Sequence, residues 1–426
     1  MAVPAFLALI AEPLYLLADA AIIGHLGTPE LAGLGIAGAI LQTVVGLCVF
    51  LAYGTTAAVA RLLGAGDLRA ALSQGMDGIW LAAVIGVLAT ALGLVLLGPL
   101  VTAFGADAAT AAHAIDYLAW ALWGTVPLLV VLAGTGILRG LQDTRTPLYV
   151  AVGGNALNVV LSLALVHGAG LGIAGAAIGT VVAQSLSALG FLVVVVRAAR
   201  REGARLAPVP LGILRAGRAG VPLLVRTLTL RASLLLTTVV ATGAGTTSLA
   251  AHQLAMTLWG FLAFALDAIA IAAQALTGRS LGAGEIEQTR RITARMVRWG
   301  WLSGIVTGVG LAALSPVLGP LFTGDTAVHE ALVPALLIAA AGQPLAGIVF
   351  VLDGVLIGAG DGRYLAWGGL VVLAVFAPFA WWSPHFPGPA LVGLWVAFVG
   401  VFMTGRAVVL VHRSRGDRWL LVGATR

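Results

Sequence analysis

The sequence predicts an all-α integral membrane protein with twelve transmembrane helices in two parallel six-helix lobes around a central cleft. Of its 426 residues, 60% are hydrophobic and only 9% are charged, whereas a soluble domain carries about 25% charged residues. Twelve apolar segments are long enough to cross a bilayer, and several short motifs recur at one constant spacing. A chain this apolar has more apolar surface than folding can hide from water. We therefore expect the lipid bilayer to surround it and to be its partner.

A bilayer-spanning helix needs about 20 mainly apolar residues. The twelve segments that meet this requirement are residues 2–23, 31–60, 78–102, 115–138, 147–166, 171–196, 219–242, 247–277, 299–321, 331–357, 364–382 and 389–410.

The arginines predict the orientation of the chain. All 23 residues counted as Lys or Arg are arginine, and arginines occupy the loops that follow the even-numbered segments but not those that follow the odd-numbered ones. Positively charged loops stay in the cytoplasm. We therefore expect a multi-pass protein of the inner (cytoplasmic) membrane with both termini cytoplasmic. The basic charge is a topology signal, so we expect no nucleic-acid partner.

The chain contains an internal repeat. "RLLGAGD" (61–67) recurs as "RSLGAGE" (279–285), and "GTPELAGLGIA" (27–37) recurs as "GTTSLAAHQLA" (245–255), each after 218 residues. Six helices form an even number, so both halves enter the membrane from the same side and the repeat is parallel. The predicted parts are an N-lobe (1–200), a basic cytoplasmic linker on the surface (201–218), a C-lobe (219–412) and a cytoplasmic tail (413–426). We expect a monomer.

Few ionisable residues fall within the predicted helices. Such a group costs at least about 2.5–3.5 kcal/mol at the bilayer centre, and it is usually functional or paired. The candidates are Glu12, Asp19, Arg226, Arg231, Asp267 and Asp353.

Asp19 in the first helix and Asn158 and Ser162 in the fifth lie at similar depth and could meet inside the N-lobe. Burial disfavours the charged form of a carboxylate, so Asp19 could load a proton outside and release it inside. A second possibility is a Na⁺ site, with Asp19 and Asn158 as ligands of the metal ion. The structural alternative is a hydrogen bond between Asp19 and neighbouring helices.

The C-lobe carries the other intramembrane charges. Arg226 and Asp267 come to similar depth, which predicts a salt bridge between the seventh and eighth helices. The 218-residue shift makes Arg231 the repeat counterpart of Pro13, the residue next to Glu12. Glu12 and Arg231 could therefore face each other across the cleft as a gate. Asp353 could bind a cation or substrate, or pair locally.

The remaining motifs argue against catalysis. "GLGIAG" (170–175) matches a dinucleotide-binding pattern but opens a membrane helix with no preceding strand. The "GAGD" and "GAGE" turns lack the Lys-Ser/Thr of a phosphate-binding loop, and no zinc-hydrolase, cysteine-cluster or G-x-S-x-G motif occurs. We therefore expect no cofactor and no enzyme activity. A membrane-embedded prenyltransferase, the alternative from another class, would need paired aspartate-rich loops, whereas the aspartates here are scattered singly.

The chain resembles the multidrug and toxic-compound extrusion (MATE) family, in particular its DinF-like branch. The resemblance covers nearly the full length and is carried by "PLYLLADAAIIGHLG", by "AAHQLAMTLWGFLAFALDAIAIAAQALTGRSLGAG" and by "GQPLAGIVFVLDGVLIGAGDGRYL". It implies a secondary active multidrug exporter that antiports small organic, often cationic substrates against H⁺ or Na⁺ by alternating access. A lipid or lipid-linked sugar flippase of related fold is the nearest alternative.

The resemblance also assigns residues. A helix 1 aspartate, a helix 5 asparagine and a helix 5 aspartate form the family's coupling cluster; the first two match Asp19 and Asn158. Ser162 occupies the third position, a departure that removes one negative ligand and favours H⁺ over Na⁺. Pro4 aligns with Pro222 but lacks its basic lead-in, so a slightly longer N-terminus is expected.

Overall fold

The computed structural model describes residues 2–424, apart from the side chain of Glu12. Over these residues the structure is helical and contains no strand. Twelve helical spans are long and apolar enough to cross a membrane, which confirms the twelve predicted segments. They are Ala2–Gly24, Thr28–Gly64, Leu68–Val95, Ala108–Gly140, Arg145–Gly168, Gly172–Arg201, Pro210–Gly243, Thr246–Gly282, Ile286–Phe322, Thr326–Gly358, Gly362–His385 and Ala390–Arg415.

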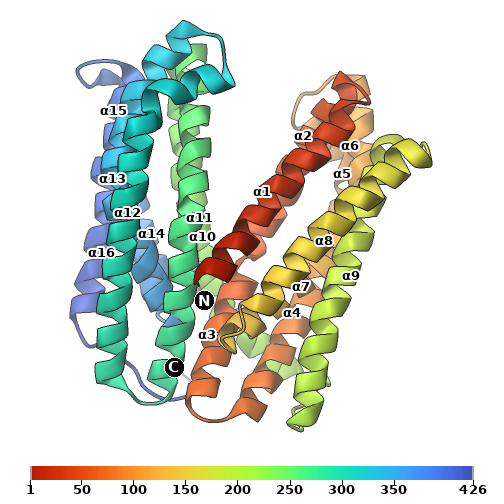
Figure 1. Cartoon of the computed structure of the whole chain (residues 1–426), viewed down its shortest axis with the longest axis vertical. Helices are drawn as coiled ribbons and strands as arrows, with labels where there is room; N and C mark the ends of the chain where they lie inside the picture. Colours follow the sequence, from red (N-terminus) through yellow and green to blue (C-terminus); the bar gives the residue numbers. More distant parts are fainter. Residues whose placement is uncertain (1, 425–426) are drawn as a thin grey trace. The chain divides into compact units, whose positions relative to one another are not determined.

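The chain divides into two compact units, residues 3–220 and 221–426. The first unit is drawn in warm to green colours in Figure 1. Its helices are α1 (Ala2–Gly24), α2 (Thr28–Cys48), α3 (Phe50–Gly64), α4 (Leu68–Val95), the short α5 (Leu97–Thr102), α6 (Ala108–Ala121), α7 (Thr125–Gly140), α8 (Arg145–Leu163) and α9 (Gly172–Arg201). Helix α9 packs against α6, α7 and α8, and this packing positions the N-lobe polar residues.

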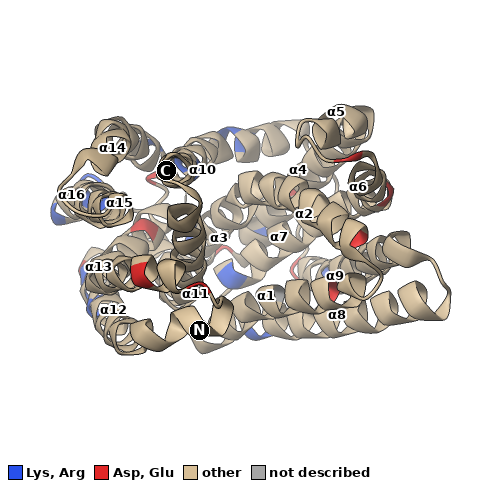
Figure 2. Cartoon of the chain, turned by 90° about the horizontal axis from the view of Figure 1, so that it is seen from above, with Lys and Arg blue, Asp and Glu red and all other residues tan. Residues whose placement is uncertain are grey.

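The second unit is drawn in green to blue. Its helices are α10 (Pro210–Gly243), which begins in the first unit, α11 (Thr246–Gly282), α12 (Ile286–Phe322), α13 (Thr326–Gly358), α14 (Gly362–Trp382), α15 (Ala390–Ala397) and α16 (Thr404–Arg415). Helix α13 packs against α11, α12, α14 and α16. Figure 2 shows how few charged residues interrupt the helices of either unit.

Two spans change to a π-helical turn beside polar residues. The turn η2 (Ala164–Gly168) directly follows α8, two residues after Ser162, and η4 (Phe398–Met403) directly precedes α16. Single π turns within α-helices are frequent at functional sites. They also rotate the residues beyond them relative to the helix before, so helical periodicity does not hold through these points.

The repeated "GAGD" and "GAGE" motifs are turns at the helix ends. Gly66 and Gly284, which are 218 residues apart, adopt φ angles of 81° and 78°. Glycine adopts positive φ at no steric cost, whereas other residues rarely do. Asp67 then begins the next helix, because its carboxylate accepts a 2.7 Å hydrogen bond from the Ala70 amide. The recurrence of this motif therefore has a structural cause.

The predicted linker 201–218 is largely exposed, in keeping with a surface connector, and its second half is helical. Residues 210–218 are already the first turns of α10. Ala204 is buried and Leu206 is partly buried, and both pack with Leu72 of α4 and Ala199 of α9. The sequence suggested a solvated connection because this stretch is rich in arginine and proline. Within this exposed stretch, Ala204 and Leu206 are the residues that anchor it to the first unit.

Helices α12 and α13 approach closely along a line of glycines. Gly300, Gly304 and Gly308 recur every four residues on α12, and a Cβ at Gly304 would lie 2.7 Å from the Cα of Pro344. Small residues at this spacing let the backbones of two membrane helices meet.

We expect Gly304→Leu to lower the stability of the second unit, because the added side chain forces α12 and α13 apart. Overpacking typically costs roughly 1–3 kcal/mol, which should appear as a lower Tm of the purified protein in detergent. Gly310→Leu is the matched control, since a Cβ at Gly310 meets nothing within 4 Å. Equal melting temperatures for the two variants would contradict this account of the packing.

Candidate functional site

The structure brings Asp19, Asn158 and Ser162 together inside the first unit. Asp19 is 3% exposed, Asn158 4% and Ser162 0%. Asp19 comes from α1, and the other two lie one turn apart on α8. The hydroxyls of Ser162 and of Tyr117 on α6 are the hydrogen-bonding neighbours of the Asp19 carboxylate. The arrangement matches the prediction from depth along the helices; the role of these residues in coupling stays a prediction.

A chain of hydrogen bonds leads away from Asp19. Ser162 Oγ donates to Asn158 Oδ1 over 3.0 Å, and Asn158 Nδ2 donates to Thr180 Oγ1 on α9 over 3.0 Å. Thr180 donates its single hydroxyl hydrogen to the Ala176 carbonyl at 3.0 Å. Its oxygen must therefore accept the 3.3 Å contact from the Tyr15 hydroxyl. Three helices, α1, α8 and α9, are thus joined through buried polar side chains.

Asp19 differs from the other buried acids in having no basic partner among the described residues. The remaining buried aspartates in the described part of the chain each pair with arginine: Asp77 with Arg205, Asp353 with Arg226 and Arg406, and Asp361 with Arg413. Oδ1 of Asp19 lacks any hydrogen-bond partner among the described residues. A buried carboxylate without compensation favours its neutral form. Asp19 is therefore the acid whose surroundings suit gain and loss of a proton.

Tyr117, Thr180 and Tyr15 were not predicted from the sequence. Each is a single polar residue on a largely apolar segment, and its contact depends on the rotation of its helix about its own axis. Asn155, about one turn before Asn158, makes a further link from α8 to α1, because its Nδ2 donates to the Ala11 carbonyl at 2.9 Å. The signal available in the sequence was that these polar residues stand in apolar segments. That signal does not say which neighbouring helix each side chain faces.

The second unit has no equivalent of this cluster. The 218-residue shift relates Asp19, Tyr117, Asn158, Ser162 and Thr180 to Thr237, Ala335, Phe376, Ala380 and Phe398. These five counterparts are buried, and Phe376 and Phe398 both lie against Phe402, with ring centroids 5.2 and 5.3 Å away. Two polar positions of the first unit are thus aromatic in the second, and Thr237 Oγ1 lies 3.1 Å from Nε2 of buried His252. The two lobes are therefore chemically unequal.

A charge network lies elsewhere in the second unit. Arg226 Nε donates to Asp353 Oδ1 at 3.4 Å, and Arg226 Nη2 also donates to Oδ2. Arg406 Nη2 lies 3.4 Å from Oδ1 of the same carboxylate. The three side chains line one pocket among α10, α13, α14 and α16. Two guanidinium groups on one carboxylate make Asp353 a poor cation ligand and support the local pairing that was one of its two predicted roles.

The other predicted C-lobe residues are placed as follows. The structure shows the Asp353 carboxylate on Arg226, while half-buried Asp267 acts electrostatically on Arg406. The predicted salt bridge between Arg226 and Asp267 stays a prediction. Arg231 is exposed on α10. The side chain of Glu12 lies outside the described residues, so the Glu12–Arg231 gate stays a prediction. Depth along the helices did not indicate that Asp353 joins Arg226 and Arg406 in one network.

The described residues place no three His, Cys, Asp or Glu side chains close enough to hold a metal ion. The Na⁺ site, with oxygens of Asp19 and Asn158 as ligands, stays a prediction. Asn158 Oδ1 accepts a hydrogen bond from Ser162.

Tyr117→Phe should slow export without abolishing it. The substitution keeps the buried ring but removes the hydroxyl that faces Asp19. A net hydrogen bond is worth roughly 0.5–1.5 kcal/mol, equivalent to about a 2- to 10-fold change in rate. Initial rates of substrate efflux from cells check this, with Tyr149→Phe, an exposed tyrosine on α8, as the control. Equal rates for both variants would mean that the Tyr117 hydroxyl does not assist Asp19.

Comparison with known proteins identifies the family. The family model described as MatE matches twice, over residues 4–164 and 222–382. Both the starts and the ends of these matches are 218 residues apart, the same shift that relates the sequence motifs.

Curated relatives cover the chain almost completely. Protein DETOXIFICATION 44, chloroplastic, of Arabidopsis thaliana is 33% identical over 99% of this chain and 83% of its own length. The probable multidrug resistance protein NorM of Bradyrhizobium diazoefficiens is 29% identical over 99% and 93%. DNA damage-inducible protein F of Escherichia coli is 28% identical over 96% and 90%.

Solved structures share the fold. The Vibrio cholerae MATE transporter VcmN in its bent form has a TM-score of 0.88 at 23% identity, and it covers 98% of this chain and 96% of its own. A MOP superfamily transporter from Pyrococcus furiosus also has a TM-score of 0.88, at 22% identity over 97% and 94% of the two chains.

Proposed function

Because the chain belongs to the MatE family of multidrug and toxic-compound transporters, we propose that it exports small organic compounds in exchange for protons by alternating access. The observation that supports proton coupling most strongly is the surroundings of Asp19, a buried carboxylate without a basic partner among the described residues. The other buried aspartates in the described part of the chain are each engaged in an ion pair with arginine.

The hydrogen-bond chain suggests how protonation of Asp19 could be felt by α8. The Ser162 hydroxyl has one hydrogen, and it faces two acceptors, Asp19 and Asn158 Oδ1. When Asp19 is neutral, its own O–H can donate to Ser162, which is then free to donate to Asn158. When Asp19 is ionised it has no hydrogen, so it competes with Asn158 for that of Ser162. Loss of the proton would thereby loosen the bond between Ser162 and Asn158.

Ser162 occupies the position where the family resemblance implies a second aspartate. With a single carboxylate, the cluster can carry one proton, whereas a Na⁺ ion would have only one anionic ligand. We therefore propose H⁺ as the coupling ion, with no cofactor and no catalytic reaction. The proposed partners are organic substrates and the bilayer, with the protein a monomer in the cytoplasmic membrane and both termini cytoplasmic.

Expression in a bacterium that lacks its own major efflux pumps tests the transport proposal. We expect cells making the protein to accumulate less of a cationic dye such as ethidium than cells carrying an empty vector. A protonophore should abolish the difference, because the proton gradient drives export. Unchanged accumulation across a panel of cationic and neutral amphipathic compounds, with the protein present in the membrane, would contradict the proposal.

A further inference from the structure

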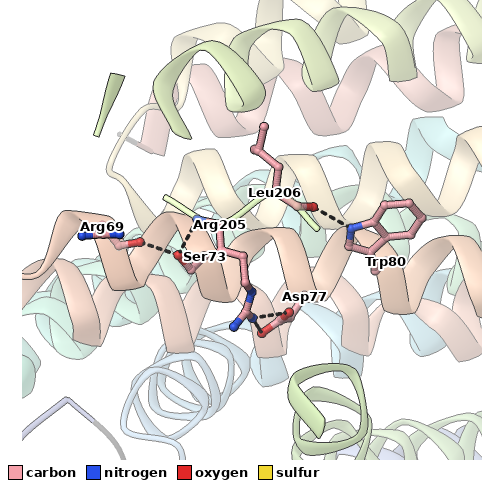
Figure 3. Close-up of polar contacts among 6 residues, drawn as sticks. All are labelled: Arg69, Ser73, Asp77, Trp80, Arg205 and Leu206. Carbon is pink, nitrogen blue, oxygen red and sulfur yellow. Dashed lines mark hydrogen bonds and ion pairs between the residues drawn. The ribbon is translucent and has the colours of Figure 1, made fainter. Parts of the chain in front are cut away.

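The segment between α9 and α10, residues 202–209, is fastened to α4. The Arg205 amide donates to Ser73 Oγ at 3.1 Å, and the Trp80 indole Nε1 donates to the Leu206 carbonyl at 2.9 Å. Between these two bonds, Arg205 Nη2 contacts both oxygens of Asp77, at 2.8 and 2.9 Å. Figure 3 shows the three contacts in a row along α4. Ser73, Asp77 and Trp80 follow the i, i+4, i+7 spacing of one helix face.

Asp77 is the centre of this attachment. Its side chain is only 5% exposed, whereas that of Arg205 is 43% exposed. Removing one partner of a buried ion pair leaves an uncompensated charge, which is strongly unfavourable. The buried Asp77 carboxylate therefore fixes the position of segment 202–209, and the Arg205 side chain reaches it from the protein surface. The 218-residue shift relates Asp77 to Arg295, so the second unit does not repeat this acid.

The first turns of α10 are packed against the same unit. A Cβ at Gly212 would lie 2.6 Å from Cγ of Asp77, and a Cβ at Gly220 would lie 2.5 Å from the ring of Phe50. Both glycines are thus needed for the close approach. Ala216, Ala219 and Gly220 also line a pocket with residues of α3 and α4. The attachment therefore continues from residue 205 to residue 220.

The boundary between the two units falls within α10, between Gly220 and Val221. The helix runs without interruption from Pro210 to Gly243 and contains Pro222. Proline has no amide hydrogen and clashes with the carbonyl four residues earlier, so it weakens a helix at that point. The connection between the units therefore has no slack after residue 205, and its weakest point lies next to the boundary.

We propose that Asp77 is a positioning residue for transport: it fastens the inter-lobe segment to α4, so that rearrangements between the lobes bend α10 at Gly220–Pro222. If the segment were loose, the lobes could shift without bending α10, and substrate-driven changes in one lobe would be passed less efficiently to the other. This inference rests on the proposed alternating-access function; the attachment itself is tested separately from transport.

Trypsin tests the attachment independently of any transport. In inside-out membrane vesicles, we expect the native protein to be cut after exposed Arg201 but only slowly after Arg205. Asp77→Asn should speed cleavage after Arg205 several-fold and leave cleavage after Arg201 unchanged, as resolved by mass spectrometry. Trp80→Phe, which removes only the indole N–H, should give a smaller increase and serves if Asp77→Asn fails to fold. Equally fast cleavage after Arg205 in the native protein and both variants would overturn the attachment.

Transport kinetics test its role. Arg205→Gln should lower the maximal rate of substrate transport in proteoliposomes several-fold, with substrate binding at equilibrium unchanged. Arg205→Lys should restore most of the rate, because one nitrogen makes both contacts with Asp77. The control is Arg200→Gln, an exposed arginine that makes no ion pair within the described residues. A native rate for Arg205→Gln would overturn the positioning role, and so would failure of Arg205→Lys to recover. If the native protein transports nothing, the proposed function fails, while the trypsin result still decides whether the attachment exists.

Discussion

Asp19→Asn should abolish export and return drug susceptibility to that of cells without the protein. The substitution keeps the size of the side chain but removes its ability to gain and lose a proton. Asp19 is buried, and within the described part of the chain no arginine compensates it and no second acid stands at its C-lobe counterpart, Thr237. No other residue of the cluster can then carry the coupling proton. Minimum inhibitory concentrations of exported compounds measure the effect.

The matched control is Asp116→Asn. Asp116 lies on α6 of the same lobe, but it is exposed and makes no described ion pair. The Asp116→Asn variant should therefore export substrate at the native level when it is expressed as strongly as the native protein. Export by Asp19→Asn at the level of this control would contradict the coupling role.

Asp353→Asn should sharply reduce the amount of stable protein. The carboxylate is 8% exposed at its side chain and lies between Arg226 and Arg406, each 14% exposed. Breaking a buried ion pair by removing one partner costs roughly 3–5 kcal/mol, a large part of the 5–15 kcal/mol that typically separates folded from unfolded protein. We expect a markedly lower Tm in detergent and less monodisperse protein on size exclusion.

The double variant Asp353→Asn with Arg226→Gln separates charge from packing. Because it removes a cation together with the anion, it should recover part of the stability lost by the single variant. A native Tm for Asp353→Asn, or no recovery in the double variant, would show that the charge network does not hold these helices together.

The transmembrane spans and the internal repeat could be predicted from sequence because both depend on local properties. A helix in lipid must satisfy its own backbone, so length and apolarity locate it without knowledge of its neighbours. The Asp19–Asn158–Ser162 cluster was also accessible, since position along a helix gives depth in the membrane. The same reasoning found that Arg226 belongs to a charge network.

Helix rotation and packing could not be predicted in this way. Depth offered Asp267 as a partner for Arg226, but depth does not say which faces of the helices meet, so it could not indicate the Asp353 carboxylate that the structure shows on Arg226. The partner Arg406 follows the π turn η4, which shifts the helical register in a way that periodicity does not anticipate. Tyr117 and Thr180 were missed for the same reason. The segment 202–209 is largely exposed, in keeping with the predicted surface connector, but its composition did not indicate that Ala204 and Leu206 pack against α4 and α9.

The central claim is that Asp19 carries the proton that drives export. Its most direct test is transport by purified protein in proteoliposomes with an imposed pH gradient and no sodium. We predict that the native protein moves substrate against the proton flow, with proton movement that depends on substrate, and that Asp19→Asn does neither while still binding substrate. Gradient-driven transport by Asp19→Asn at the native rate, or a strict sodium requirement of the native protein, would contradict the account.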